Sequence, residues 1–302
     1  MNYQIITDGS CDLPTELVTE KNLLVVPFYV SFDEQNYQKE IVDIGIREFY
    51  EEMVANPKVF PKSSMPSVQD YADVFEPLAK KDIPVICICI TTKFSGSMQS
   101  ALTAKDMILE NFPHAKITVI DATVNTVLQG LYVLEAVRMQ EAGWEYEEVT
   151  ARLETIKSTG RIFFTVGDME YLKHGGRIGK LTGIAGSILG IKPLITLKEG
   201  EIFPSGITRS RKKSMDKVIE LLLEYLKQTG KDIHSYSLAI GFGYDKKEAE
   251  EFKNLALSVI NEKLKGASLL TEEQLPLYQI GATISVHTGP YPLGFGIIEK
   301  AY

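Results

Sequence analysis

Residues 85–90 form the continuous apolar run VICICI, and this run constrains the fold more than any other feature of the chain. A strand in which every residue is apolar has no face for solvent, so both of its faces must be covered. This pattern, with helical periodicity on either side of it, indicates an inner strand of a parallel sheet covered by helices. Cys87 and Cys89 would lie on one face of that strand, where they could not comfortably form a disulfide, and we expect buried free thiols.

The segments around this run alternate between strand and helix patterns. The other expected strands cover residues 3–7, 24–30 and 116–120; the expected helices cover 43–55, 101–112, 127–139 and a segment that ends at Gly160. A further amphipathic helix begins at Ser67, because Ser67 and Asp70 form an S-x-x-D capping pattern. The alternation predicts an α/β domain with a parallel sheet over residues 1–160.

The pattern changes after residue 160, where we place a domain boundary. Residues 194–197 and 201–203 predict a hairpin. Long amphipathic helices are expected at 215–226 and 245–264, and further strands at 162–166, 237–242, 279–286 and 295–298. The second half, residues 161–302, is therefore interpreted as an α+β domain with helices on one face of a mixed sheet.

The charge of the chain limits the classes of partner. Its 302 residues include 32 Lys and Arg against 40 Asp and Glu, and the formal net charge of −8 argues against a broad nucleic-acid surface. The N-terminus lacks the basic segment of a signal peptide, and no apolar run approaches the ~18 residues of a transmembrane helix. We expect a cytoplasmic protein without integral membrane association. The four His residues have no metal-ligand spacing to one another or to Cys, so no metal site is predicted.

A loop rich in hydroxyl groups, TTKFSGS at residues 91–97, lies between the buried strand and the next helix. In an open α/β sheet, ligands bind beyond the carboxyl ends of the strands, and the free amides of a helix N-terminus favour negative charge. The loop therefore predicts an anion site, whereas helix capping by Ser95 or Ser97 would need only one hydroxyl. It lacks the Gly-Lys-Ser/Thr ending of a P-loop, so ATP binding here is unsupported.

Two more hydroxyl-rich loops could meet the first one. Residues 62–67, KSSMPS, precede the helix at Ser67, and residues 7–10, TDGS, follow the first strand. Each alone is typical of turns and caps, but loops at strand ends of one α/β domain can converge on a single crevice, and we expect this here. His287 ends the strand expected at 284–286 and opens the turn HTGP, from which its ring could face a pocket.

Five motifs in this order resemble the DegV family of bacterial fatty-acid-binding proteins, which includes the binding subunit of fatty acid kinase. They are TDGSCDLP at 7–14, KSSMPS at 62–67, FSGS at 94–97 with QSA at 99–101, LKHGGRI at 172–178 and HTGP at 287–290. The resemblance spans nearly the whole chain. It implies two α/β-type domains with one long-chain fatty acid buried between them, its carboxylate held by hydroxyls and a histidine, and no other cofactor.

The resemblance also implies roles for particular residues. Carried onto matching positions, it assigns the carboxylate-binding groups to Ser63, Ser64, Ser95, His287 and Thr288. It places Arg177 and Arg209 near a phosphoryl-transfer or partner-docking surface. The implied partner is a separate ATP-dependent fatty acid kinase that makes acyl-phosphate, and this chain would supply neither a catalytic residue nor an ATP site.

A few positions depart from the family pattern. Gly9 stands where the family usually has Ser, and Ser63 replaces a common Thr but keeps the hydroxyl. Tyr291 and Pro292 stand where Gly-Ala is usual, which adds bulk close to the expected head group.

Two other functions stay open from the sequence. A hydrolase could use Ser95 as nucleophile and His287 as base on an ester or thioester. It would lack the G-x-S-x-G elbow, since Lys93 stands two residues before Ser95, and its orienting carboxylate could only be guessed as Asp8. A binder of sugar phosphates or other small anions would explain the hydroxyl loops alone, and it is distinguished by whether the bound species is apolar.

Overall fold

The computed structural model describes residues 3–185, 190–264 and 268–302. Its N-terminal half contains a parallel sheet in the order β2-β1-β6-β7, formed by β1 (Gln4–Asp8), β2 (Leu24–Val26), β6 (Val85–Cys89) and β7 (Ile117–Asp121). β6 lies between two neighbours, and all five of its residues are buried. The apolar run is therefore an inner strand of a parallel sheet, as predicted.

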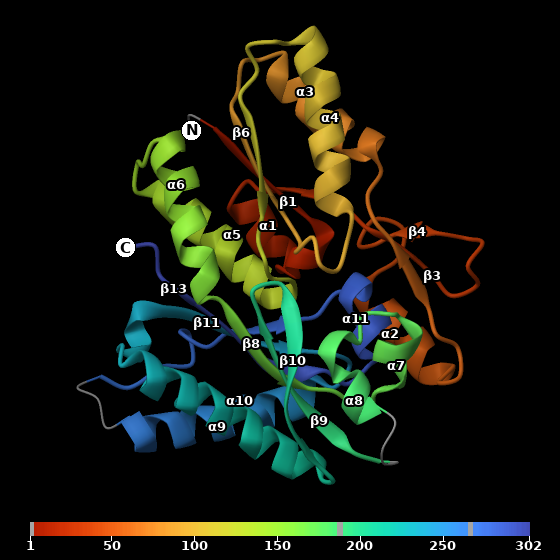
Figure 1. Cartoon of the computed structure of the whole chain (residues 1–302), viewed down its shortest axis with the longest axis vertical. Coiled ribbons are helices and arrows are strands. Elements are labelled where there is room, and N and C mark those ends of the chain that lie inside the picture. Colours follow the sequence, from red (N-terminus) through yellow and green to blue (C-terminus); the bar gives the residue numbers. More distant parts are fainter. Residues whose placement is uncertain (1–2, 186–189, 265–267) are drawn as a thin grey trace.

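Helices cover both faces of this sheet (Figure 1). Cys87 and Cys89 share an apolar cluster with α3 (Val68–Ala79) and α4 (Ser97–Asn111), whereas the alternate residues of β6 share one with α5 (Thr126–Glu141). The two thiols are free and buried, as expected, with their Sγ atoms 3.8 Å apart. α3 begins with the predicted capping box, in which the Ser67 hydroxyl accepts a hydrogen bond from the backbone N–H three residues later.

The second half contains a mixed sheet in the order β10-β9-β8-β13-β11-β12. Its strands are β8 (Arg161–Thr165), β9 (Lys192–Lys198), β10 (Glu201–Thr208), β11 (Tyr236–Phe242), β12 (Leu277–Gln279) and β13 (Leu293–Glu299). β11 and β12 pair in parallel, and the other neighbours are antiparallel. α9 (Arg211–Thr229) and α10 (Lys246–Leu264) cover one face, and α5 packs on the other.

α5 lies between the two large sheets and is buried on most of its surface (Figure 1). It packs closely on β13 at Gly296, where a Cβ atom would lie 3.2 Å from the backbone of Leu128. One apolar cluster accordingly contains residues of both sheets, among them Ile88 and Ile298. The two halves share this core, and a domain boundary at residue 160 stays a prediction.

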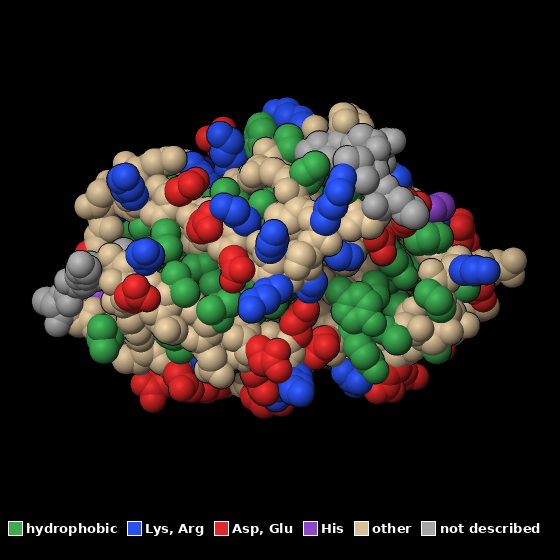
Figure 2. Space-filling view, turned by 90° about the horizontal axis from the view of Figure 1, so that it is seen from below, with side chains coloured by type: hydrophobic (Ala, Val, Ile, Leu, Met, Phe, Trp, Pro, Cys, Tyr) green, Lys and Arg blue, Asp and Glu red, His purple; other side chains and the backbone are tan. Residues whose placement is uncertain are grey.

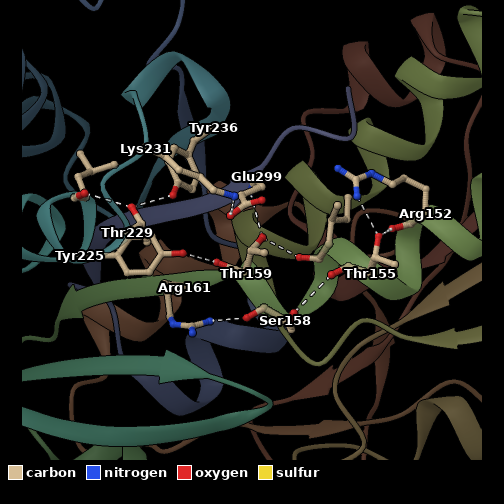
Figure 3. A network of polar contacts seen from close by, with 12 residues as sticks. Arg152, Thr155, Ser158, Thr159, Arg161, Tyr225, Thr229, Lys231, Tyr236 and Glu299 are labelled. Atoms are coloured by element: carbon tan, nitrogen blue, oxygen red, sulfur yellow. Dashed lines mark hydrogen bonds and ion pairs between the residues drawn. The ribbon is translucent and has the colours of Figure 1, made fainter. Parts of the chain in front are cut away.

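Hydrogen bonds join both halves of the chain near residue 160 (Figure 3). The junction follows α6 (Tyr146–Ile156). Thr159 accepts a hydrogen bond from Glu299 N at its hydroxyl and another from the Tyr225 hydroxyl at its carbonyl, the latter at 2.8 Å. Lys231 forms an ion pair with Glu299 at 2.6 Å in the same network. These contacts fix the connection between the halves.

A small sheet in the order β4-β3-β5 completes the N-terminal half. It is formed by β3 (Tyr29–Ser31), β4 (Gln38–Lys39) and β5 (Lys62–Ser64), and it packs with α2 (Ile46–Ala55) and α11 (Ala282–Thr288). The single strand expected at 24–30 is wrong, because the chain leaves one sheet at β2 and enters another at β3. Pro27 stands between them, where it lacks the N–H that a continuous strand would need.

The strand expected at 279–286 is also wrong. β12 ends at Gln279, and after the N-cap residue Gly281 the chain forms the helix α11. Residues 282–286 are all buried, so this segment lacks the exposed polar residues at helical spacing by which an amphipathic helix is recognised in a sequence. Its β-branched residues favour a strand locally. Packing on every side overrides this preference. His287 therefore lies in the last turn of a helix.

The other α-helices of the described residues are short: α1 (Thr15–Glu20), α7 (Glu170–His174) and α8 (Thr182–Ala185). In the described part of the chain, no helix combines the length and apolar character needed to cross a bilayer. The face in Figure 2 carries Lys and Arg side chains interspersed with Asp and Glu, without a continuous basic area.

Candidate ligand-binding site

A cavity of about 270 Å³ lies between the two halves of the molecule. Its walls are mainly apolar and come from the mixed sheet, from α5 and from the segment that follows β6; they include Ile90, Val127, Phe164, Leu197, Ile202 and Leu293. A mainly apolar space of this kind suits an extended hydrocarbon better than a sugar or a free phosphate.

Polar groups from three elements line the same cavity. β5 contributes Ser63 and Ser64, the loop between β6 and α4 contributes Ser95, and α11 contributes His287 and Thr288. All five residues assigned to carboxylate binding are thus brought to one cavity, although they lie far apart in the sequence. Whether they hold a carboxylate stays a prediction.

His287 and Ser63 form the closest polar pair among these groups. The Ser63 hydroxyl lies 3.3 Å from Nε2 of His287, and Nδ1 has no hydrogen-bond partner among the described residues. Burial, together with the positive charges of Arg177 and Lys62, lowers the pKa of His287 to about 4. The imidazole is therefore neutral at pH 7 and has one N–H to donate.

Ser95 is held in place through Ser97. The Ser95 hydroxyl accepts from Ser97 N at 3.1 Å, and the Ser97 hydroxyl donates to Asp8 at 2.8 Å. Asp8 is fully buried, which raises its pKa, and it also accepts hydrogen bonds from Ser10, Gln129 and Ile90 N. Of the three hydroxyl loops expected to converge, two line the cavity. The third, TDGS at 7–10, does not line it and instead binds Ser97 of the Ser95 loop through Asp8.

This arrangement differs from a catalytic triad. His287 pairs with Ser63, and no hydrogen bond between Ser95 and His287 occurs among the described residues. The carboxylate of Asp8 accepts from Ser97, so it does not orient the imidazole.

A hollow of about 580 Å³ adjoins the cavity at its Ser95 end and contains the basic residues Lys93, Arg177 and Lys180. Phe94, Ser95 and Arg177 line both spaces, so the hollow is continuous with the cavity. Arg177 donates to the carbonyls of Phe94 and Gly175 at 3.2 and 2.9 Å. The hollow therefore forms a basic mouth.

Arg209 lies elsewhere. Glu201, at the start of β10, lines the mouth, and Arg209 follows the last residue of that strand. At ~3.3 Å per residue, the eight-residue strand separates the two by about 25 Å. Arg177 and Arg209 are therefore not neighbours.

A family model described as "Uncharacterised protein, DegV family" matches residues 2–300. The chain belongs to the DegV family. A DegV domain-containing protein of Clostridium perfringens is 30% identical over 303 residues, and the match covers 100% of both chains. Protein DegV of Bacillus subtilis is 30% identical over 227 residues, which are 74% of this chain and 78% of that protein.

Solved structures of DegV proteins share the fold. A stearic acid-binding protein from Eubacterium ventriosum matches with a TM-score of 0.91 at 42% identity, covering 99% of each chain. A DegV family protein from Thermus thermophilus, whose structure is described as fatty acid binding, matches with a TM-score of 0.81 at 28% identity, covering 99% of this chain and all of that one. The predicted α/β architecture with a parallel and a mixed sheet is thus that of the DegV family.

Some lining residues of the DegV cavity carry no signal in the sequence. Thr126 and Thr283 line it, and neither belongs to one of the motifs; Thr126 begins α5 with a φ of 49°. Met65 lies over Gly96 at the mouth, where a Cβ atom on residue 96 would be 2.7 Å from its sulfur. Pro292 lines the cavity as expected, whereas Tyr291 is 38% exposed and packs beside Gly167 and Tyr244 instead.

Proposed function

We propose that this DegV protein binds one long-chain fatty acid between its halves, with the acyl chain in the cavity and the carboxylate at the basic mouth. The supporting observation is the lining of the cavity: mainly apolar walls from the mixed sheet and α5 are combined with hydroxyls and a neutral histidine, and the cavity adjoins the basic hollow at Ser95 and Arg177. The related proteins from Eubacterium ventriosum and Thermus thermophilus are described as binding stearic acid and fatty acid.

Burial of the acyl chain supplies most of the affinity. A 16-carbon chain at ~0.8 kcal/mol per buried CH₂ gives a gross gain of about 12 kcal/mol before the costs of association. Each hydrogen bond to the carboxylate contributes about 1.5 to 3 kcal/mol at best. The head-group contacts therefore mainly fix the position of the carboxylate.

The carboxylate lies among Ser63, Ser64, Ser95, His287 and Thr288 in this proposal. The hydroxyls and the imidazole N–H donate to its oxygens. The bound negative charge raises the pKa of His287 from its low value in the free protein.

Presentation to a kinase follows from the open mouth. A carboxylate oxygen attacks the γ-phosphorus of ATP held by a separate fatty acid kinase, the bond to ADP breaks, and an acyl-phosphate forms. This chain holds and orients the nucleophile and supplies no catalytic residue or ATP site of its own. Arg177 and Arg209 belong to the surface that meets the kinase, in the cytoplasm where ATP is available.

Organic extraction and mass spectrometry of protein purified from a bacterial host test the first step. We expect about one long-chain fatty acid per chain. Lipid-free protein that also fails to bind added oleate or palmitate would end the proposal. For the second step, acyl-phosphate should form only when a fatty acid kinase and ATP are both added to the loaded protein.

A further inference from the structure

Two carboxyl groups are buried at the start of α11, and neither forms an ion pair with Lys or Arg among the described residues. Asp12 is 6% exposed and Glu40 is 1% exposed. Asp12 Oδ1 and Glu40 Oε1 have no hydrogen-bond partner among the described residues. Buried polar groups are normally paired, and buried charges cost several kcal/mol unless they are neutralised. This pair therefore requires an explanation that the head-group site does not give.

The two unpartnered oxygens both lie beside Gly281. A Cβ atom built on Gly281 would lie 2.6 Å from Asp12 Oδ1 and closer still to Glu40 Oε1, so these oxygens are about 5 Å apart at most. Two ionised carboxylates at this separation in a buried site repel strongly. One proton between them removes the repulsion and makes each free oxygen a hydrogen-bond partner of the other.

No Lys or Arg pairs with either carboxyl among the described residues, and the polar groups that face them are backbone N–H groups at the start of α11, with Thr283 N donating to Glu40 Oε2 at 3.4 Å, and uncharged or acidic side chains. Asp8 and Cys11 are also near the pair, and so is Tyr50 of α2, whose hydroxyl donates to Ile280 O. α5 and α11 contribute the hydroxyls of Thr126 and Thr283, which donate to Asp12 Oδ2 and Glu40 Oε2, both at 2.5 Å. Each carboxyl thus has one oxygen fixed by a threonine and one unpartnered oxygen beside Gly281.

The pair also joins the two halves at α11. Glu40 follows β4 in the N-terminal half, and Thr283, which it binds, lies in the first turn of α11. The same short helix carries His287 and Thr288 at its other end, in the cavity. A shift of α11 at Glu40 would therefore move the head-group residues.

We propose that Asp12 and Glu40 share one proton and form a positioning pair that holds α11, and with it His287 and Thr288, against the N-terminal half. This inference rests on the proposed function for its effect on fatty acid binding. Loss of the shared proton leaves two adjacent carboxylates, which separate and release α11. The pair makes presentation of the ligand dependent on pH.

The direction of the pH effect follows from burial. Burial raises the pKa of Glu40 from an ordinary value of 4.5 to about 7, and burial and Glu40 raise the pKa of Asp12. Between pH 4.5 and 7 the folded protein retains a proton that the unfolded chain has lost, so stability falls as pH rises through this window. Above pH 7 the folded state itself loses the proton, and the repulsion acts on α11.

Glu40→Gln tests the pair, because the amide can donate to Asp12 as the shared proton does, without titrating. Thermal melts of lipid-free protein from pH 4.5 to 7 should show the melting temperature of wild type falling by roughly 5 °C relative to Glu40→Gln. Oleate affinity should fall above pH 7 in wild type by up to ~10-fold per pH unit, and stay flat in the variant. NMR signals of the His287 ring should shift over the same range in wild type alone.

Asp12→Asn is a second variant with the same expected behaviour, in case Glu40→Gln folds poorly. Glu34→Gln removes an exposed carboxylate from the same segment and should behave like wild type. If the melting temperature changes equally with pH in wild type, Glu40→Gln and Asp12→Asn, the shared proton is overturned. If the melting temperature of wild type depends on pH as expected but the NMR signals of the His287 ring do not shift, the link to α11 is overturned. If oleate binds at no pH, the proposed function fails, whereas the melts and ring signals still test the pair.

Discussion

The Ser63 hydroxyl lies 3.3 Å from Nε2 of His287, although the two residues are 224 positions apart in the sequence. Ser63 is on a short strand of the N-terminal half and His287 is at the end of a helix near the C-terminus. Their contact places a neutral imidazole and a hydroxyl in the lining of a mainly apolar cavity. Several of the following predictions depend on this pair.

Because of His287, the free energy of unfolding should decrease at acidic pH. Its pKa is lowered from 6.5 to about 4 in the folded protein, so between these values the unfolded chain binds more protons. Stability is therefore lost as pH falls through this window, by up to about 3 kcal/mol. Urea unfolding measures the free energy of unfolding of wild type and of His287→Gln. The value for wild type minus the value for the variant should fall as the pH decreases from 6.5 to 4. A constant difference would mean that the imidazole is not buried neutral.

Ser95→Ala should separate holding the ligand from presenting it. The variant loses about 1 to 3 kcal/mol of head-group hydrogen bonding but keeps the acyl cavity, so it should still co-purify with lipid. Kinase-dependent acyl-phosphate formation should nevertheless fall by ~10²-fold, because transfer requires a closely positioned oxygen. Lipid occupancy and turnover are measured on the same preparation, with thermal melts as a folding control. Wild-type turnover would contradict the head-group assignment.

Arg177→Ala should leave lipid binding unchanged and raise the KM of the loaded protein for the kinase reaction. Arg177 lies at the mouth, where a docked kinase must approach, whereas its contacts within the chain are to two carbonyls. Arg209→Ala should have a smaller effect, because Arg209 lies beyond the far end of β10. Lys247→Ala, on the exposed side of α10, serves as a control. An effect of Lys247→Ala equal to that of Arg177→Ala would argue against a specific docking surface.

The isolated chain should hydrolyse neither ATP nor acyl esters. Among the described residues, Ser95 is not hydrogen-bonded to His287. The Asp8 carboxylate accepts a hydrogen bond from Ser97 and none from the imidazole. Assays with p-nitrophenyl esters and with ATP should therefore give background rates. Steady ester turnover that disappears in both Ser95→Ala and His287→Ala would favour a hydrolase.

Asp8→Asn should destabilise the protein and loosen the Ser95 loop. The carboxylate accepts four hydrogen bonds in a fully buried position, from Ser10, Gln129, Ile90 N and Ser97. An amide can accept only at its oxygen and leaves a partner unpaired, which costs about 1 to 3 kcal/mol. Urea unfolding measures the loss, and hydrogen exchange at residues 95–97 should increase. An unchanged unfolding free energy would show that these bonds do not support the loop.

Local patterns in the sequence determined much of the fold. The apolar run at 85–90 predicted an inner strand, and β6 is one, because six apolar residues in succession must be covered wherever they lie. Ser67 and Asp70 predicted a helix start, since a capping box depends only on residues a turn apart. Both features act over a few residues, so a sequence alone can specify them.

Tertiary structure decided what depends on distant neighbours. Residues 282–286 look like a strand locally, but they are enclosed on all sides and form a helix, which places His287 at its C-terminal end. Motifs at 62–67, 94–97 and 287–290 marked the head-group residues individually, whereas the order of the sheets brings them to one cavity. The approach of Asp12 and Glu40 to each other beside Gly281 had no sequence signal at all, because burial and proximity, which shift the pKa values of carboxyl groups, exist only in the folded chain.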